Sequence, residues 1–252
     1  MNADAAFSLV GLVPARSGSK RILGKNVRRL GGHPLVAYTI VAALRSEVCD
    51  AVVVSTDSDE IAAIADYYGA EVPCLRPAGL AGDLSPDVEW VRFTIDTLAS
   101  AGRTFGFFSI LRPTSPLRQP ETIRRAWTEF RSDPGADSLR AVELCRQHPG
   151  KMWSLDGDRI RPLLDDHGAK PPWHSRPYQA LPPVYVQNAS LEIARHNVLF
   201  DSETIAGNVV RPFHCRGTEG FDLNDESDWL LLERFVANGS VRLPEISLAP
   251  WA

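Results

Sequence analysis

The sequence has 252 residues, of which 44% are hydrophobic and 23% are charged, as in an ordinary globular protein. This length allows one large domain with a buried core that needs neither disulfides nor metals for its stability. The formal net charge of −4 argues against a nucleic-acid partner, which would favour a basic surface, but leaves a small anionic ligand open.

The cysteines and histidines predict neither disulfides nor a zinc site. The four cysteines form no CxxC pair, and the six histidines form no HxH or HxxxH pair. Free thiols indicate a reducing compartment, so we expect a cytoplasmic protein. The first apolar run has no basic residue before it, and no run reaches the length that spans a bilayer, so we expect neither a signal peptide nor a membrane partner.

Strand-like and helix-like segments alternate along most of the chain. The apolar run at 7–13 ends at Pro14 and is typical of a buried parallel strand, and Pro34 is typical of the first turn of a helix. This alternation predicts an α/β fold with a mostly parallel, Rossmann-like sheet and helices on both faces. In chain order we expect a strand at 7–13, a helix at 34–45, a strand at 51–55, a helix at 57–68 ending at Gly69, a strand at 71–75, a helix at 85–99, a strand at 105–111, a helix at 121–130, strands at 137–143, 185–194 and 209–215, and a helix at 225–237.

Proline is dense between residues 146 and 183, and long periodic runs are absent from that part of the sequence. A segment of this length without regular periodicity is uncommon within a compact domain unless it serves a function. We therefore expect a single domain over 1–252, in which 146–183 is either a long functional loop or an arm that packs against a partner.

The loop after the first strand carries cations and small residues. Arg16, Lys20, Arg21 and Lys25 lie in the stretch 14–26, which is neither a Walker A loop nor a GxGxxG loop. In an open α/β sheet, ligands bind beyond the carboxyl ends of the strands, where this loop belongs. Cations and accessible backbone N–H groups are what a polyphosphate requires, although a solvated basic loop is the alternative.

Several motifs, taken in order, resemble the N-acylneuraminate cytidylyltransferases, which are also called CMP-sialic acid synthetases. The resemblance covers nearly the whole chain, with the first motif and the central motif as its most specific parts. The matching stretches are Pro14 to Asn26, His33 to Ile40, Val52 to Asp57, Leu75 to Pro77, Leu80 to Asp83, Arg112 to Arg118, Leu181 to Asn188, and Phe221 to Asn224.

This resemblance implies the nucleotide-diphospho-sugar transferase version of the fold, with a small dimerisation arm, and a reaction. The anomeric hydroxyl of an acidic nine-carbon keto sugar attacks the α-phosphorus of CTP, and pyrophosphate leaves. Arg16, Lys20 and Lys25 would hold the triphosphate and act in catalysis. Arg76 would help to hold the nucleoside, unless it is a surface arginine packed before Pro77. The implied nucleotide-binding residues are Arg16, Ser19, Lys20, Lys25, Asn26, Arg76 and Asp87.

The implied metal site lies at Asp222 and Asn224. Mg²⁺ binds oxygen ligands, commonly one or two carboxylates together with phosphate oxygens, and residues two apart on an extended segment face the same way. The family usually has Asp-x-Asp here, so Asn224 keeps an oxygen and loses a charge. The alternative for Asn224 is an N-cap of the helix that begins near Asp225.

The sugar side departs most from the family. Arg112 stands where the family commonly has Gln, and we expect it to pair with an acidic group of the sugar and to set the choice of acceptor, unless it forms an internal salt bridge. Arg176 is offset from the expected arginine, and Asn188-Ala189 replaces Asn-Gly. The implied sugar-binding residues are Arg112, Thr114, Ser115, Lys151, Arg176, Tyr185 and Asn188.

The resemblance also implies a homodimer in which the 146–183 arm contacts the partner's sugar site. The partners expected from the sequence are therefore CTP, an acidic sugar and a second copy of the chain. The acceptor could instead be legionaminate, pseudaminate or 3-deoxy-manno-octulosonate. A nucleotide-binding relative that has lost turnover is the alternative outside the enzymes.

Overall fold

The computed structural model describes residues 7–201 and 204–252. The chain divides into two compact units, one made of Met1–Ala141 with Asn188–Ala252 and the other of Val142–Gln187. The second unit includes the whole of the proline-dense stretch at 146–183. Among the described residues, no helix combines the length and the apolar character needed to cross a membrane.

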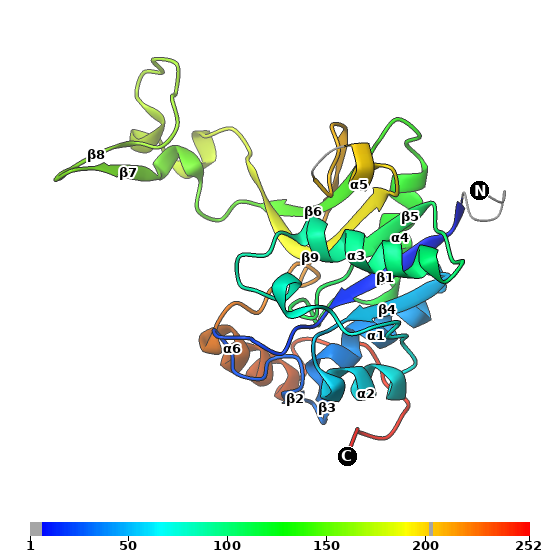
Figure 1. Ribbon diagram of the computed structural model, residues 1–252. Coiled ribbons are helices and arrows are strands. Elements are labelled where there is room, and N and C mark those ends of the chain that lie inside the picture. The colour runs from blue at the N-terminus through cyan, green and yellow to red at the C-terminus, as the bar shows by residue number, and fades with distance from the viewer. Residues whose placement is uncertain (1–6, 202–203) are drawn as a thin grey trace. The chain divides into compact units, whose positions relative to one another are not determined.

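A six-stranded sheet with the strand order β10-β6-β9-β5-β1-β4 forms the centre of the fold (Figure 1). Strand β1 pairs in parallel with both β4 and β5, and β5 pairs antiparallel with β9, so the expected mostly parallel α/β sheet is confirmed. The strands are β1 (Leu9–Pro14), β4 (Ala51–Ser55), β5 (Phe107–Ile110), β6 (Ser138–Leu144), β9 (Tyr185–Arg195) and β10 (Val210–His214).

The prediction of a strand at 71–75 is wrong. Glu71 forms one isolated parallel bridge with Val53, and no strand follows it over residues 72–75. Pro73 lies in the middle of this stretch and has no backbone N–H to give to a ladder, so the pairing ends after one residue.

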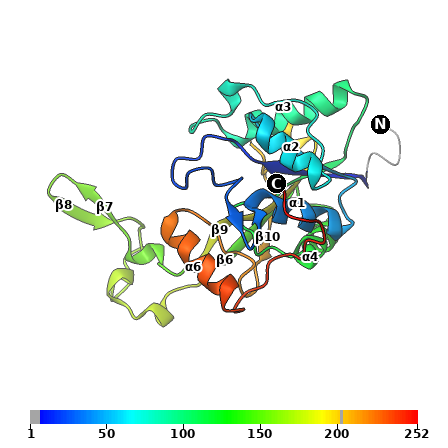
Figure 2. The same ribbon diagram turned by 90° about the horizontal axis from the view of Figure 1, so that it is seen from below.

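Helices cover both faces of the sheet, with α1 and α4 on one face and α3 on the other (Figure 2). Along β1, Leu9 and Val13 pack into the core on the α1 side, whereas Val10 and Leu12 pack against α3. This alternation is the two-residue period of a strand buried on both faces, and each such buried side chain contributes roughly 1.5–3 kcal/mol. The helices are α1 (Leu35–Ser46), α2 (Asp59–Tyr67), α3 (Asp87–Ser100), α4 (Pro120–Arg131), α5 (Val198–Asp201) and α6 (Glu226–Ala237).

The helix ends follow local capping chemistry. Gly69 has φ +90° just after α2, as expected of a residue that ends a helix. The N-cap of α6 is Asp225, whose carboxylate accepts hydrogen bonds from the N–H groups of Ser227 and Asp228. The alternative that Asn224 caps this helix is therefore wrong, since the carboxylate one residue later takes that place.

The cation-rich loop between β1 and α1 is fixed by its own turns and by contacts with α6. The loop and α6 lie side by side in Figure 2. Gly24 has φ +59°, and its carbonyl accepts hydrogen bonds from the N–H groups of Val27 and Arg28. Arg28 forms an ion pair of 2.7 Å with Glu226 and lies over the Trp229 ring. The loop ends in a two-residue hairpin of β2 (Arg29–Leu30) and β3 (His33–Pro34).

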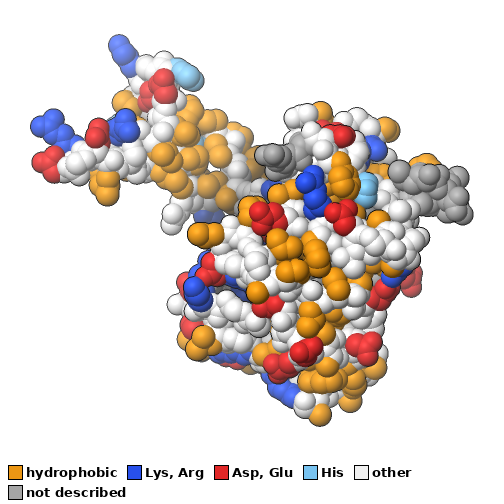
Figure 3. Space-filling view, viewed as in Figure 1, with side chains coloured by type: hydrophobic (Ala, Val, Ile, Leu, Met, Phe, Trp, Pro, Cys, Tyr) orange, Lys and Arg blue, Asp and Glu red, His pale blue; other side chains and the backbone are white. Residues whose placement is uncertain are grey.

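The second unit contains a hairpin that the sequence analysis did not predict. Strands β7 (Trp153–Asp156) and β8 (Arg159–Pro162) pair antiparallel around Gly157, which has φ +64°. Short 3-10 turns follow at Trp173–Ser175 and Tyr178–Ala180. Figure 3 shows hydrophobic side chains of this unit gathered behind the charged tip of the hairpin. In the hairpin itself, Leu155 is 81% exposed and Ile160 57%.

Candidate functional site

A cavity of about 450 Å³ opens in the first unit at the carboxyl ends of β1 and β5. These neighbouring strands are parallel, so the loops that follow Pro14 and Ile110 leave the same edge of the sheet. The first turn of α3 forms another wall of the cavity. The predicted site residues that line it are Arg16, Ser19, Lys20, Lys25, Asn26, Arg76, Asp87, Arg112 and Thr114.

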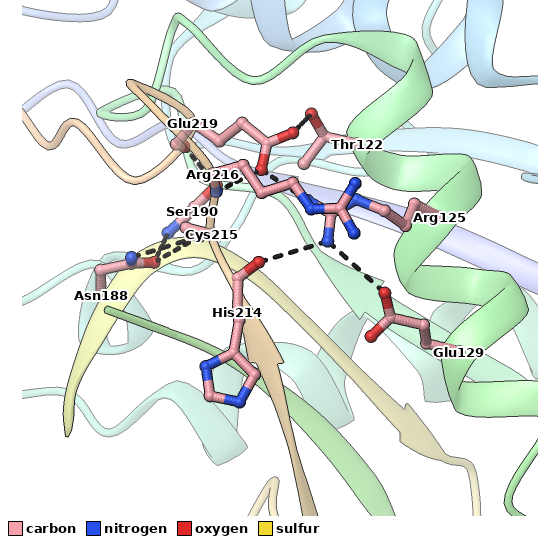
Figure 4. A network of polar contacts seen from close by, with 9 residues as sticks. All are labelled: Thr122, Arg125, Glu129, Asn188, Ser190, His214, Cys215, Arg216 and Glu219. Atoms are coloured by element: carbon pink, nitrogen blue, oxygen red, sulfur yellow. Dashed lines mark hydrogen bonds and ion pairs between the residues drawn. The ribbon is translucent and has the colours of Figure 1, made fainter. Parts of the chain in front are cut away.

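Four predicted site residues of the first unit do not line this cavity: Ser115, Asn188, Asp222 and Asn224. Ser115 is buried. Asn188 is also buried, and its side chain interacts with Cys215 and with the N–H of Ser190 in the network of Figure 4. In the second unit, Lys151 donates hydrogen bonds to the carbonyls of His174 and Arg176.

Tyr185 begins β9 and is half-exposed. It belongs to the second unit, like Lys151 and Arg176. The structure therefore brings Lys151 and Arg176 together within the second unit, and it gathers the nucleotide-side residues within the first unit.

Two cations of the cavity share one carboxylate. Nη2 of Arg16 lies 2.7 Å from Oδ1 of Asp83, and Nζ of Lys20 lies 2.6 Å from Oδ2 of the same side chain. Arg16 also donates a hydrogen bond to the carbonyl of Ala81. Hydrogen bonds from Lys20 and Arg16 hold the pKa of Asp83 below its usual value, so the group is charged at neutral pH.

The loop that carries these cations is attached to the sheet at its start. The N–H and hydroxyl of Ser17 both donate to the carboxylate of Asp57, which follows β4. The buried amide of Asn26 donates to the carbonyl of Arg16. These contacts hold the backbone of the loop at the mouth of the cavity without using its basic side chains.

Lys25 is a partly buried cation of the loop. Burial lowers the pKa of its ammonium, the charge of Asp222 raises it, and the charges of Arg21 and Arg16 lower it further. Its Nζ lies 3.5 Å from the carbonyl oxygen of Leu223. A desolvated ammonium with other cations around it attracts an anion strongly, as a phosphate site requires.

Arg76 is 6% exposed, so the alternative that it is a surface arginine is wrong. Its guanidinium donates hydrogen bonds to the hydroxyl and carbonyl of Ser55, and it lies 4.8 Å from the ring centroid of Trp90. Burial lowers its pKa to about 10. Arg76 and Trp90 both line the cavity, and a guanidinium beside an aromatic ring suits a planar heterocyclic base.

Arg112 is neutralised by the protein itself. It donates hydrogen bonds to both carboxylate oxygens of Asp87, at 3.3 and 2.8 Å, and to Oε1 of the buried Glu192 at 3.0 Å. Burial alone would lower the pKa of Arg112, but these two acids raise it above its usual value. The internal salt bridge is thus the arrangement observed, and Arg112 needs no acidic group of a sugar to balance its charge.

A second arginine fixes the backbone beneath the site. Arg118 is fully buried and donates hydrogen bonds to the carbonyls of Ser190 and Arg112 and to the hydroxyl of Thr39. Burial lowers its pKa to about 9. Arg118 therefore joins α1, β9 and the loop after β5, and it positions the residues on either side of the cavity.

Leu223, the residue after Asp222, contacts Thr114 beside the cation-rich loop at 14–26, which is the candidate phosphate loop. The N–H of Leu223 donates to the carbonyl of Thr114 at 2.8 Å, and Oδ1 of Asp222 is buried without a hydrogen-bond partner among the described residues. The described residues contain no group of three or more His, Cys, Asp or Glu side chains placed to hold a metal. Mg²⁺ is commonly held by one or two carboxylates plus phosphate oxygens, so an unpartnered carboxylate oxygen beside a phosphate loop fits it.

Asn224 is committed to protein contacts. Its Oδ1 lies 3.5 Å from Nη1 of Arg21, its Nδ2 is 3.4 Å from the carbonyl of Asp222, and its N–H donates to Asp228. The carboxylate of Asp222 is thus the better oxygen ligand of the pair.

The residues that line the cavity without having been assigned a role from the sequence include Asp83, Trp90 and Pro113. Asp83 lies in the motif Leu80 to Asp83, so the resemblance pointed to this residue. The sequence did not show that it contacts Arg16 and Lys20. Glu192, which contacts Arg112, had a different signal, since it is an acidic residue between Leu191 and Ile193 in an apolar strand. An acid at a buried strand position needs a cation nearby.

Comparisons with known proteins agree with this geometry. A family model described as cytidylyltransferase matches residues 10–148. The CMP-N,N'-diacetyllegionaminic acid synthase of Legionella pneumophila is 37% identical over 235 residues, which cover 90% of this chain and 96% of that protein. An N-acylneuraminate cytidylyltransferase of Escherichia coli is 41% identical over 118 residues, which cover 47% of this chain and 27% of that protein.

Solved structures share the fold. One, described as CMP:2-keto-3-deoxy-manno-octonic acid synthetase complexed with CTP, matches with a TM-score of 0.66 at 14% identity, over 92% of this chain and 99% of that one. A 4-diphosphocytidyl-2C-methyl-D-erythritol synthase matches with a TM-score of 0.64 at 12% identity, over 91% and 98%. The resemblance that the motifs indicated is confirmed.

Proposed function

This chain belongs to the cytidylyltransferase family, and we propose that it transfers the cytidylyl group of CTP to an acidic nine-carbon keto sugar. The observation that carries the proposal is the cavity that Arg16, Lys20 and Lys25 line together with Arg76 and Trp90. A cluster of cations suits a triphosphate, and a guanidinium beside an aromatic ring suits a base, so one cavity can hold both ends of CTP.

The reaction requires positioning and charge neutralisation rather than covalent chemistry by the protein. The sugar hydroxyl oxygen forms a bond to the α-phosphorus, the bond from that phosphorus to the bridging oxygen breaks, and pyrophosphate leaves as the hydroxyl proton is released. Arg16, Lys20 and Lys25 neutralise the charge that grows on the leaving pyrophosphate. Arg76 holds the base side, so that the α-phosphorus stays at a fixed distance from the acceptor.

The acceptor that the relatives favour is a nonulosonic acid. The Legionella pneumophila relative, which matches this chain over nearly its whole length, is named for N,N'-diacetyllegionaminic acid, and a Campylobacter jejuni relative at 36% identity over 47% of this chain and 51% of that protein is named for pseudaminic acid. We therefore place legionaminate first among the acceptors, followed by N-acetylneuraminate and pseudaminate.

Mg²⁺ is the proposed cofactor, with Asp222 as its protein ligand. The buried, unpartnered Oδ1 of Asp222 and the nearby Lys25 and Thr114 support this position. When bound, the ion would neutralise phosphate charge and orient the triphosphate. Asn224 would contribute little, because Arg21 already occupies its amide oxygen.

A homodimer is the proposed assembly, with the second unit as its arm. The hairpin of this unit exposes Leu155 and Ile160, which pair across β7 and β8, and Leu163 follows at 52% exposure. Exposed apolar side chains gathered in so small a unit favour a partner surface. A second copy of the chain could then bring Lys151 and Arg176 to the sugar side of the site.

A cytoplasmic location is proposed on chemical grounds. None of the four cysteines, Cys49, Cys74, Cys145 and Cys215, forms a disulfide, as a reducing compartment favours.

The experiment that tests the activity is a screen for pyrophosphate release. The purified protein, CTP and Mg²⁺ are incubated with each acidic ketose in turn, and CMP-sugar is identified by mass. Release with a nonulosonic acid and none without acceptor supports the proposal. Release with other nucleoside triphosphates but not CTP, or with none of the acidic ketoses, would overturn it.

A further inference from the structure

The carboxylate of Asp83 lies where a phosphate group is expected. Each of its two oxygens contacts a different cation of the phosphate loop, Arg16 at 2.7 Å and Lys20 at 2.6 Å. All three residues line the same cavity. Two oxygens bridging two cations at these distances reproduce the contacts that a non-bridging pair of phosphate oxygens would make.

This arrangement contributes little to holding the fold together. The side chains of Arg16, Lys20 and Asp83 are 32%, 81% and 38% exposed, and ion pairs at such exposed positions stabilise a folded chain only weakly. The backbone hydrogen bonds within residues 77–85 are local, such as Ala81 N–H to Ala78 and Ser85 N–H to Gly82. The segment that carries Asp83 is therefore built to hold its own shape while its carboxylate can leave the cations.

We propose that Asp83 is an internal competitor for the polyphosphate, and that it sets the affinity of the site for CTP and pyrophosphate. This inference rests on the proposed function, because it takes Arg16 and Lys20 as phosphate-binding cations. In the empty site the carboxylate neutralises part of their charge. A polyphosphate must displace it to bind, and the carboxylate pairs again with the two cations when pyrophosphate leaves.

Competition of this kind has a definite thermodynamic signature. Only the fraction of molecules in which Asp83 has left the cations can bind a polyphosphate, so the observed dissociation constant is the intrinsic one divided by that fraction. Every ligand that needs both cations is weakened by the same factor. Cytidine, which has no phosphate, is not weakened at all. From the modest strength of exposed ion pairs, the factor should be about 3- to 10-fold.

The test is calorimetric binding to wild-type protein and to Asp83→Asn, with pyrophosphate, tripolyphosphate, CTP and cytidine as the probes. We expect the variant to bind the first three more tightly by one common factor of about 3- to 10-fold. Cytidine should bind both proteins equally. The gain should shrink as salt is raised, because screening weakens the competing ion pairs. Asp83→Ser should reproduce the gain, since it too removes the carboxylate.

Asp66→Asn is the matched control, because it removes one negative charge from an exposed position on α2. Its affinities should equal those of wild type, which excludes net charge as the cause of the gain. Unchanged or weaker pyrophosphate binding by Asp83→Asn would overturn the inference, as would an equal gain in Asp66→Asn. If instead the wild-type protein binds pyrophosphate but not CTP, the proposed function fails, and the competition at Asp83 is still measured by pyrophosphate.

Discussion

The guanidinium of Arg112 donates two hydrogen bonds to the carboxylate of Asp87, with Nη2 2.8 Å from Oδ2 and Nη1 3.3 Å from Oδ1. This pair links the loop after β5 to the first turn of α3. Glu192 on β9 contacts the same guanidinium and also lies 3.3 Å from Arg140. The arginine thereby balances two acids, of which Asp87 lines the cavity.

Arg112→Gln should lower both stability and CTP affinity. Asp87 and Glu192 would lose a buried cation, and a charged acceptor left without its partner costs roughly 1–3 kcal/mol or more. The uncompensated acids would also repel the phosphates. Thermal unfolding and CTP binding are the measurements, and the double variant Arg112→Gln/Asp87→Asn should recover part of both losses. Normal CTP affinity with a changed preference among sugars would instead restore the direct sugar-binding role expected from the sequence.

The same pair predicts an acid-sensitive contribution to stability. Burial alone would raise the pKa of Asp87, but Arg112 outweighs that effect and holds it below its usual value. A carboxyl with a depressed pKa in the folded state stabilises the protein above its unfolded pKa, near 4, and loses that contribution as pH falls through the folded pKa. Denaturation between about pH 2 and 6 should show a shallower acid loss in Asp87→Asn than in wild type. Identical slopes would show that the pair contributes nothing to stability.

Lys25 should control both rate and alkaline behaviour. Lys25→Ala removes a cation that neutralises the leaving pyrophosphate, so we expect kcat/KM to fall on the order of 100-fold or more. Because burial lowers the pKa of Lys25, the free site loses this charge at a lower pH than an ordinary lysine would. CTP affinity should therefore weaken as pH rises toward that pKa, and Lys25→Arg should move the decline to higher pH. A decline unchanged in Lys25→Arg would assign it to another group.

Asp222 should control metal binding. Electron paramagnetic resonance of Mn²⁺, used as a probe in the presence of CTP, measures bound metal without turnover. Asp222→Asn should weaken Mn²⁺ binding, since the unpartnered carboxylate oxygen would be lost, whereas Asn224→Asp should strengthen it by adding a negative charge beside the site. Mn²⁺ binding that is the same in Asp222→Asn as in wild type would place the metal elsewhere.

The hairpin of the second unit should determine assembly. Leu155→Glu together with Ile160→Glu puts two charges on the paired apolar surface of β7 and β8, and should weaken self-association by about tenfold or more. Leu230→Glu, at a 63% exposed position on α6, is the control and should leave it unchanged. Sedimentation across a range of protein concentrations measures the effect. A wild-type protein that stays monomeric at micromolar concentration would refute the proposed dimer.

Local patterns were enough to predict most of the fold. The apolar run ending at Pro14, the helix-opening Pro34 and the helix-ending Gly69 are short-range signals, and the elements around them formed close to their expected bounds. The sequence pattern predicted a strand at residues 71–75, where a proline interrupts the pairing. It did not predict the two short strands around Gly157, which lie in the proline-dense stretch.

The sequence by itself determined the cations of the phosphate loop, because they follow one strand within a dozen residues and must leave the sheet at its ligand-binding edge. Only the tertiary structure decided what those charges contact. Asp83 reaches Arg16 from a loop more than sixty positions along the chain, and Glu192 reaches Arg112 from eighty positions away. The pairing of such charges depends on where separate elements place their side chains, which packing of the whole sheet fixes and local sequence does not.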